Sequence, residues 1–212
     1  MNYGQSKGLR LNYSIITDIV DKGAKILDLG CGDGILLAKL IEEKGVNGIG
    51  VEINQNAVIS SLEKGLSVIQ GDLDEGLKGF GDREYDWVIL NQTLQSTEKP
   101  DFVIEEMLRV GKKAVVSFPN FAYWKIRFYL LFLGKMPKSK ILPFEWFNTP
   151  NIHLLTVNDF YNFCKERNIE ILKSVFMTKA NVKTNFITHL FSNFFAEEVI
   201  FVLRYYVRRD SV

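Results

Sequence analysis

The chain has 212 residues, of which 47% are hydrophobic and 24% are charged, and its formal net charge is +1. That composition is ordinary for a globular protein, and the near-neutral charge excludes a general electrostatic attraction to nucleic acid or to an anionic membrane. Residues 1–10 lack an apolar signal core and no apolar run is long enough to cross a bilayer, so we expect a cytoplasmic protein without stable membrane association.

Strand and helix patterns alternate regularly up to residue 118. A helix at 12–20 is expected first, with Ile15, Ile16, Ile19 and Val20 on one face and Gly23 beyond its end. There follow a strand at 25–29, a helix at 35–44, a strand at 48–53, a helix capped by Asn54, strands at 66–70 and 86–90, a helix beginning at Pro100 and a strand at 113–118. This order predicts an α/β protein with a doubly wound, mainly parallel sheet.

The pattern changes after residue 118. Residues 121–133 are a dense aromatic and aliphatic run, and residues 134–151, rich in Pro, Lys and aromatics, are typical of an ordered loop or lid. Thr156 and Asp159 predict a capped helix, followed by strands at 169–177 and 199–206, the latter an edge or an antiparallel strand. We therefore expect seven strands in one domain, 1–212, divided into 1–118, a lid or partner segment at 119–155 and a C-terminal part at 156–212. Residues 178–196 match no motif that we can interpret.

A glycine-rich turn lies between the first strand and its helix, in the run Asp28-Leu29-Gly30-Cys31-Gly32-Asp33-Gly34. Glycines there let the backbone approach a ligand closely. A helix N-terminus attracts anions, but the carboxylates of Asp28 and Asp33 would repel a dinucleotide pyrophosphate. A ligand with positive charge suits the turn better, and S-adenosylmethionine carries a sulfonium and an ammonium group. In the alternative reading, Asp28 only caps or braces the turn.

Polar residues also follow the neighbouring strands, whose ends meet at one crevice in an open α/β sheet. Glu52, about 20 residues after Gly32, is placed to accept hydrogen bonds from ribose hydroxyls or is a solvated strand end. Asp72 is placed to accept from an adenine amine, to cap the next helix, or both. Asn91 is either a contact near the sulfonium or a turn residue, and Cys31 is expected to offer its backbone amide without thiol chemistry.

The expected cofactor contacts are Asp28, Gly30, Cys31, Gly32, Glu52, Ile53, Gly71, Asp72, Leu73 and Asn91. The expected cofactor is S-adenosylmethionine or S-adenosylhomocysteine. Cys31 and Cys164, the two cysteines of the chain, have no partner motif, so neither a disulfide framework nor a metal site is expected.

Several stretches carry a resemblance to a known family: ILDLGCGDGILLAKL, GVEIN, VIQGDLDEGL, YDWVILNQTLQ, EMLRVGKKAVVSFPNF, GKMP and LPFEWFNTPNIHLLTVNDF. The first is shared by many class I S-adenosylmethionine-dependent methyltransferases, whereas NQTLQ, SFPNF and NTPNIHL are more specific. Over nearly its whole length the chain resembles the bacterial methionine-biosynthesis protein W (MetW) family. The prolines common before the first strand are absent here, which concerns a helix boundary and leaves the site unaffected.

This resemblance implies a Rossmann-like class I methyltransferase fold with an aromatic lid insertion after the fifth strand. It implies cofactor contacts at Asp28, Gly30, Gly32, Glu52, Gly71 and Asp72. It also implies a partner, a MetX-type homoserine O-acyltransferase, whose activity members of the family support by forming a complex.

Three functions stay open. The chain is a cofactor-binding partner of the acyltransferase, an active methyltransferase acting on an unidentified small molecule, or a membrane-associated methyltransferase that uses residues 121–133 as an interfacial helix. No catalytic residue is assigned, although His153 and the weaker candidate Glu145 are possible bases. The aromatic residues Tyr123, Trp124, Trp146 and Phe147 suit an acceptor pocket, a lid core or a protein interface equally well.

Overall fold

The computed structural model describes residues 3–138, 142–178, 182–183 and 191–205. Its strands are β1 (Lys25–Leu29), β2 (Asn47–Glu52), β3 (Val68–Gln70), β4 (Tyr85–Asn91), β5 (Gly111–Pro119), β6 (Ile169–Met177), β7 (Val182–Lys183) and β8 (Glu198–Tyr205). Its helices are α1 (Tyr3–Ile19), α2 (Ile35–Lys44), α3 (Gln55–Glu63), α4 (Pro100–Val110), α5 (Trp124–Leu133), α6 (Val157–Glu166) and α8 (Ser192–Phe195), with short 3-10 helices η1 (Leu73–Glu75) and η2 (Leu94–Ser96).

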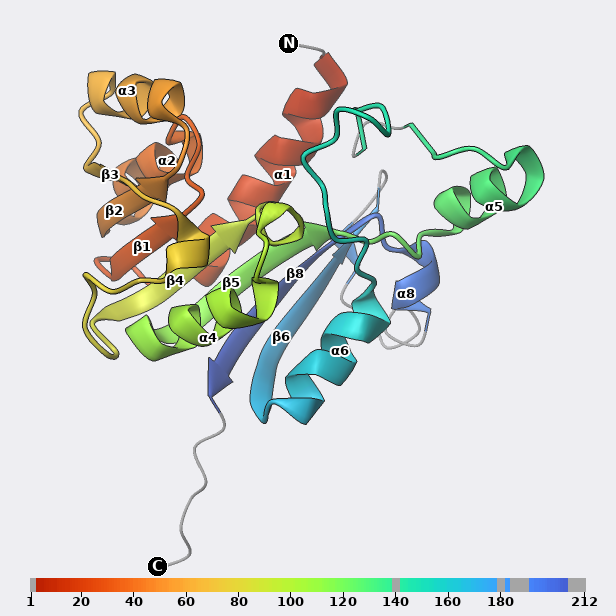
Figure 1. Cartoon of the computed structure of the whole chain (residues 1–212). Helices are drawn as coiled ribbons and strands as arrows, with labels where there is room; N and C mark the ends of the chain where they lie inside the picture. The colour runs from red at the N-terminus through yellow and green to blue at the C-terminus, as the bar shows by residue number, and fades with distance from the viewer. Residues whose placement is uncertain (1–2, 139–141, 179–181, 184–190, 206–212) are drawn as a thin grey trace, which may run out of the picture.

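All described strands join one sheet in the order β3-β2-β1-β4-β5-β8-β6-β7 (Figure 1). The five strands from β3 to β5 are parallel, and the remaining pairs are antiparallel. The chain order reverses between β1 and β4, which makes a switch point at their carboxyl ends. The α/β class and the seven expected strands are confirmed, and the two-residue β7 adds an eighth at the edge.

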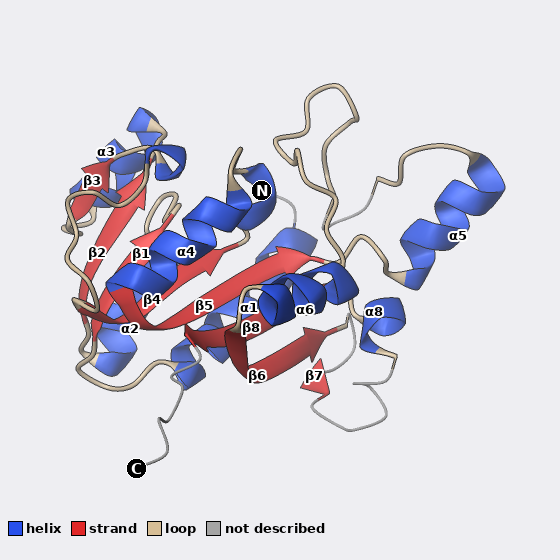
Figure 2. Ribbon diagram, turned by 60° about the horizontal axis from the view of Figure 1, so that its bottom comes forward, coloured by secondary structure: helices blue, strands red, loops and turns tan. Residues whose placement is uncertain are grey.

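Two hydrophobic cores lie on the two faces of the sheet (Figures 1 and 2). On one face α4 and α6 contribute buried side chains such as Met107 and Phe160. On the other face α1 and α2 contribute Ile16 and Leu37. The strands between these layers are apolar along most of their length because both of their faces are covered.

Local signals place most element ends correctly. The side chain of Asn54 caps α3, and Thr156 and Asp159 form the expected capping box at α6. Two details differ from expectation. The first helix begins at Tyr3, before the apolar pattern starts. The strand expected at 199–206 corresponds to β8 up to Tyr205, and residue 206 lies outside the described residues. It is an antiparallel strand between β5 and β6 and not an edge strand.

The insertion at 119–155 follows β5, and its helix α5 extends away from the sheet (Figures 1 and 2). In α5 only Ile126 is buried. The described residues between α5 and α6 contain neither helix nor strand. Within the described ranges, no helix has the length and apolar character needed to cross a membrane. A lid function for this segment stays a prediction.

Candidate functional site

The glycine turn after β1 depends on left-handed backbone. Gly30 and Gly32 have φ of 64° and 57°, which side chains with a Cβ rarely adopt. A Cβ on Gly30 would come within 2.6 Å of the Thr93 side chain, so this glycine also lets the loop after β4 pack on the turn. A Cβ on Gly32 would meet no atom within 4 Å, so it would project into open space above the turn.

The amides of this turn hold it against β2. Gly30 and Cys31 donate their backbone N–H groups to the carbonyl of Val51, at 2.8 and 3.2 Å, and Gly32 donates to Oε2 of Glu52 at 2.9 Å. A turn that binds an anion presents such amides to the ligand. The amide of Cys31 already has a partner in this structure, and the expectation that it is offered to the ligand stays a prediction. This arrangement makes the turn a poor site for a pyrophosphate.

Asp28 is a buried carboxylate, and one of its oxygens has no partner in the described part of the chain. Its side chain is 1% exposed, and its Oδ2 accepts no hydrogen bond from the residues that the structure describes. Burial, with a smaller contribution from the charge of Glu52, raises the pKa of Asp28 to about 7. An unpaired buried carboxylate is costly, so this one favours a ligand that brings positive charge or N–H donors.

Glu52 ends β2 and braces two loops at once. Its Oε2 accepts from Gly32, and its Oε1 accepts from the amide of Asn54 at 2.9 Å. Two carboxylate oxygens offer about four acceptor positions, so hydroxyl groups of a ligand can still be accepted. The next residue, Ile53, is 61% exposed and so presents an apolar surface beside these oxygens.

The residues after β3 and β4 have structural partners too. Asp72 caps η1 by accepting from the amide of Asp74 at 2.9 Å, as one of its expected roles required. Leu73 is 8% exposed and belongs to the core, so its side chain is not offered to a ligand. Gly71 donates to the carbonyl of Glu52 at 3.1 Å. Ligand contacts by these residues stay predictions.

The three most specific motifs meet at the ends of β4 and β5. Asn91, of NQTLQ, accepts at its Oδ1 from Oγ of Ser117, of SFPNF, at 2.5 Å. The carbonyl of Gln95 accepts from the amides of Ile152 and His153, of NTPNIHL, at 2.9 and 3.1 Å. Stretches far apart in the sequence therefore build one wall beside the glycine turn.

A second polar cluster, which the sequence did not indicate, lies beyond that wall. Glu198, at the start of β8, accepts hydrogen bonds from the side-chain amides of Asn12 and Gln92. Gln92 has a left-handed φ of 57°. Tyr13 lies within range of Asp33, Asp28 and Glu198, whose charges, after burial, raise the pKa of its hydroxyl. The only local signal was a charged residue opening an otherwise apolar strand pattern.

The other candidates for chemistry stand as follows. Burial and the charges of Asp28 and Glu52 raise the pKa of the Cys31 thiol to about 12, which disfavours a thiolate nucleophile. Nε2 of His153 is buried and bonds no residue that the structure describes, so a role as a base stays a prediction. Trp146 and Phe147 are 75% and 68% exposed.

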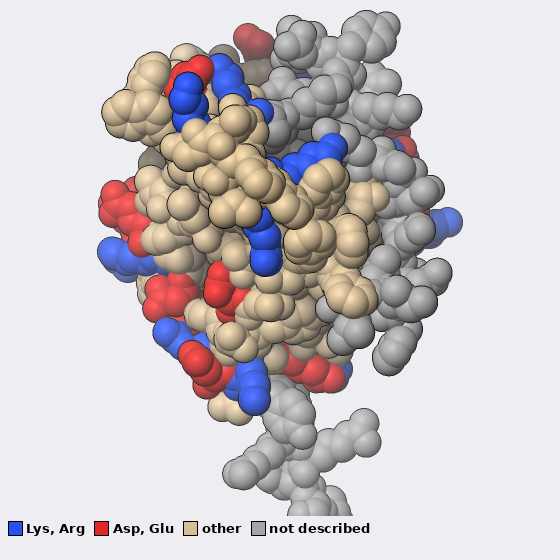
Figure 3. Space-filling model, turned by 90° about the vertical axis from the view of Figure 1, so that its right-hand side faces the viewer, with Lys and Arg blue, Asp and Glu red and all other residues tan. Residues whose placement is uncertain are grey.

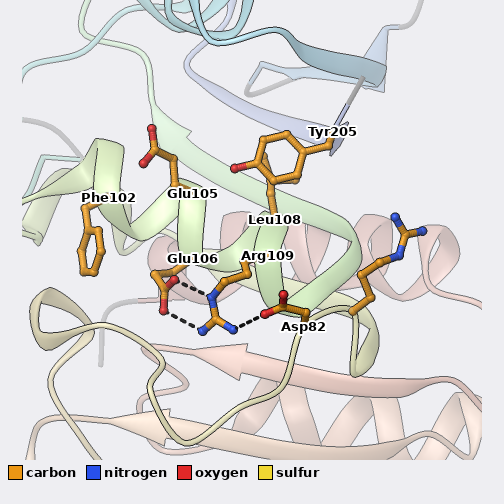
Figure 4. A pocket seen from close by; sticks show the side chains of 8 residues that line it. Asp82, Phe102, Glu105, Glu106, Leu108, Arg109 and Tyr205 are labelled. Atoms are coloured by element: carbon orange, nitrogen blue, oxygen red, sulfur yellow. Dashed lines mark hydrogen bonds and ion pairs between the residues drawn. The ribbon is translucent and has the colours of Figure 1, made fainter. Parts of the chain in front are cut away.

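A separate cavity of about 440 Å³ opens at the opposite end of the parallel strands (Figure 4). Arg109 donates to both carboxylate oxygens of Glu106 and to Asp82, at 2.6 to 2.8 Å. It also donates to the carbonyls of Leu77 and Phe80. Because these charged groups pair with one another, we interpret the residues that line the cavity as a structural ion-pair network at the end of α4.

A family model described as methionine biosynthesis protein MetW matches residues 10–203 of the chain. A bifunctional methionine biosynthesis protein MetXA/MetW of Rhodopirellula baltica is 38% identical over 177 residues, which cover 79% of this chain and 28% of that protein. A ribosomal protein L11 methyltransferase of Lachnospira eligens is 28% identical over 126 residues, 54% of this chain and 40% of that protein. The chain thus spans less than half the length of either curated relative.

Solved structures share the fold. A SAM-dependent methyltransferase of Archaeoglobus fulgidus has a TM-score of 0.65 at 17% identity, over 95% of this chain and 94% of that one. A SAM-dependent methyltransferase of Thermotoga maritima, described as a possible histamine N-methyltransferase, has a TM-score of 0.65 at 16% identity, over 92% of this chain and 87% of that one. At such identities the likeness concerns the fold alone.

Proposed function

The chain belongs to the methionine biosynthesis protein MetW family, and from this premise we propose that it binds S-adenosylmethionine and acts in methionine synthesis as a partner of a homoserine O-acyltransferase. The observation that carries the proposal is the relative in which the two functions share one name, the bifunctional MetXA/MetW protein. A fused relative suggests that the separate chains also work in contact.

The residues present fit the cofactor. The unpartnered Oδ2 of Asp28 suits the positive end of S-adenosylmethionine, and Gly32 leaves room above the turn. Glu52 would accept the ribose hydroxyls, with Ile53 against the base. Asp72 and Asn91 complete the proposed contacts at the ends of β3 and β4. When bound, the cofactor supplies an electrophilic methyl group next to a sulfonium.

Calorimetric titration with S-adenosylhomocysteine tests the cofactor proposal. Gly32→Ala is expected to weaken binding by about tenfold or more, because the added Cβ enters the space that the ligand would occupy. Gly45→Ala is the matched control, since Gly45 also has a positive φ, 63°, with no atom within 4 Å of an added Cβ. Absence of binding to the wild-type protein would refute the proposal. Equal affinity in both variants would show that the ligand does not bind next to Gly32.

The insertion supports the partner proposal. Leu131, Phe132, Trp146 and Phe147 are 72%, 72%, 75% and 68% exposed, and we call them the insertion surface. Figure 3 looks onto the side from which α5 extends and shows a broad uncharged area with Lys and Arg side chains among it. Large exposed apolar areas are rare on proteins that act alone. We assign this surface to the acyltransferase.

The partner proposal predicts that the purified chain and a homoserine O-acyltransferase elute together at micromolar concentration and that acyltransferase activity rises. Failure to form any complex at that concentration would refute the partner proposal. Repeating the cofactor titration with the acyltransferase present then measures coupling, because a cofactor that alters partner binding must itself bind differently in the complex.

An active methyltransferase is the second candidate function. The half-buried carboxylate of Glu198 beyond Asn91 favours it, because a methyl acceptor with an N–H or O–H group needs a proton acceptor nearby. Transfer of a labelled methyl group to a component of a cell extract, lost in Asp28→Ala, would support this candidate. No transfer to any fraction of the extract would remove it.

A further inference from the structure

The cluster around Glu198 consists of its carboxylate and two side-chain amides. Its Oε1 accepts from Nδ2 of Asn12 and from Nε2 of Gln92, the latter at 2.7 Å. Asn12 is 1% exposed, and its Oδ1 bonds no residue that the structure describes. Both amide groups have thus turned their donors toward the carboxylate, which leaves Oδ1 of Asn12 without a partner among the described residues.

Gln92 is held in an unfavourable conformation to reach Glu198. Its φ of 57° is left-handed, which is unusual for a residue with a side chain. Its amide donates to both the carbonyl and Oγ of Ser117, each at 3.0 Å, and its carbonyl accepts from Nε2 of Gln95 at 2.7 Å. Backbone strain that surrounding bonds over-determine in this way clusters at functional sites.

The charge of Glu198 has no balancing cation among the side chains that the structure describes. Burial comes first among the causes that raise its pKa to about 7, the charge of Glu197 raises it further, and the amides of Asn12 and Gln92 oppose the shift. The neighbouring groups are Tyr13 and, through it, Asp28 and Asp33. The cluster therefore combines negative charge with unfilled acceptor positions.

This cluster is separate from the nucleotide side of the crevice. Glu198 pairs with Pro119 at the end of β5, and the order β1-β4-β5-β8 puts three strand spacings between β8 and β1. Asp28 is in register with Val202, through Ile89 and Val115, so Glu198 is also displaced by four residues along the strands. Together these offsets place the backbone of Glu198 about 20 Å from that of Asp28. Glu198 is only partly buried, so part of its surface reaches solvent.

The acceptor oxygens of this cluster indicate which kind of ligand it suits. An ammonium group has three N–H donors and a positive charge, which complements acceptor-only atoms around a carboxylate. A metal ion is less well served, because no group of three or more His, Cys, Asp or Glu side chains in the described part of the chain is placed to hold one. We propose that Asn12, Gln92 and Glu198 bind a small molecule through a primary ammonium group, beside the proposed cofactor site.

The test uses n-propylammonium as probe and n-propanol as its neutral counterpart, followed by ligand-observed NMR at pH 8. The wild-type protein is expected to bind the cation and not the alcohol. Glu198→Gln keeps the acceptor for both amides but removes the charge, and it is expected to weaken cation binding by about tenfold or more. Glu84→Gln is the matched control, since Glu84 pairs with Lys25 at the other end of the sheet.

A second variant guards against loss of folding. Gln92→Gly keeps the left-handed backbone without strain and removes the amide that positions Glu198, so we expect a stable protein with weaker cation binding. Failure of the wild-type protein to bind the cation, or equal binding by Glu198→Gln, would overturn the proposal.

Saturating S-adenosylhomocysteine distinguishes this site from the cofactor site. Cation binding that persists with the cofactor present supports a second site, whereas complete competition would show that the cation only enters the cofactor's own pocket. If the cation binds and S-adenosylhomocysteine does not, the proposed function fails and the ammonium site stands.

Discussion

Two neighbouring regions of the molecule depart from the usual distribution of polarity in opposite directions. At the carboxyl ends of the strands, polar side chains are buried, and Asp28 and Asn12 are each 1% exposed. In the insertion, apolar side chains are exposed, and Leu131 and Trp146 reach 72% and 75%. Buried polar atoms without partners favour a small ligand, and exposed apolar surface favours a protein. The difference separates the small ligand that we propose at the strand ends from the protein partner that we propose at the insertion surface.

The largest effect is expected from a change that damages the crevice alone. Gly30→Ala is expected to lower the free energy of unfolding by about 2–4 kcal/mol, because the left-handed backbone is strained and the Cβ overlaps Thr93. Urea denaturation measures this. Gly45→Ala, with the same handedness and open space, is expected to lose only about 1–2 kcal/mol. Equal losses would mean that Thr93 moves aside freely.

The pH dependence of Asp28 comes next. Its pKa rises from 3.8 to about 7, first through burial and then through Glu52, so the folded protein holds this proton more tightly than the unfolded chain. Stability from this group is therefore lost as the pH rises from about 4 to about 7. Asp28→Asn is expected to be more stable than the wild-type protein by about 1–3 kcal/mol at pH 8, with a smaller gain at pH 5.

Chemical denaturation at both pH values measures the Asp28 effect. Glu52 and Tyr13, the ionisable groups next to Asp28, are unchanged in the variant. A gain that grows toward acid pH would contradict the assigned cause. Cofactor affinity is expected to fall in the same variant, so binding and stability would move in opposite directions.

A change to the insertion surface is expected to leave stability unchanged and to weaken partner binding. Leu131→Asp combined with Phe132→Asp is expected to change the free energy of unfolding by less than about 0.5 kcal/mol, because both side chains are exposed. Affinity for the acyltransferase is expected to fall by about tenfold or more, measured by calorimetry. Leu62→Asp is the control, as Leu62 is 51% exposed on α3. Undiminished partner affinity would move the docking surface elsewhere.

The smallest effect concerns the helix that follows the insertion. Thr156→Ala removes the cap of α6 and is expected to cost about 1 kcal/mol of stability, by thermal or urea unfolding. Partner affinity is expected to stay the same, because α6 packs on the sheet through Phe160. Thr149→Ala, in the loop of the insertion, serves as comparison. A loss of partner binding in Thr156→Ala would show that the insertion surface depends on the packing of α6 on the sheet.

Local patterns in the sequence were sufficient for the fold. The ranges 25–29, 35–44 and 169–177 match β1, α2 and β6 to the residue. Each is bounded by a signal in its own neighbourhood, and strands covered on both faces show a continuous apolar run. The caps at Asn54 and Thr156 have the same local origin, because a capping side chain bonds backbone within three residues of itself.

Tertiary structure decided the direction in which polar groups point and what covers the apolar ones. Glu198 meets Asn12 across 186 positions of the chain, and no local pattern encodes such a pair. The amide of Cys31 turns to β2, although the same residues in another backbone conformation would present it to a ligand. The sequence around Trp146 does not tell whether its side chain is buried in a core or exposed on the surface. The sequence by itself determined the order of elements, because periodicity and capping are local, whereas the site was decided by long-range packing, because hydrogen bonds and burial depend on which distant segment arrives beside each side chain.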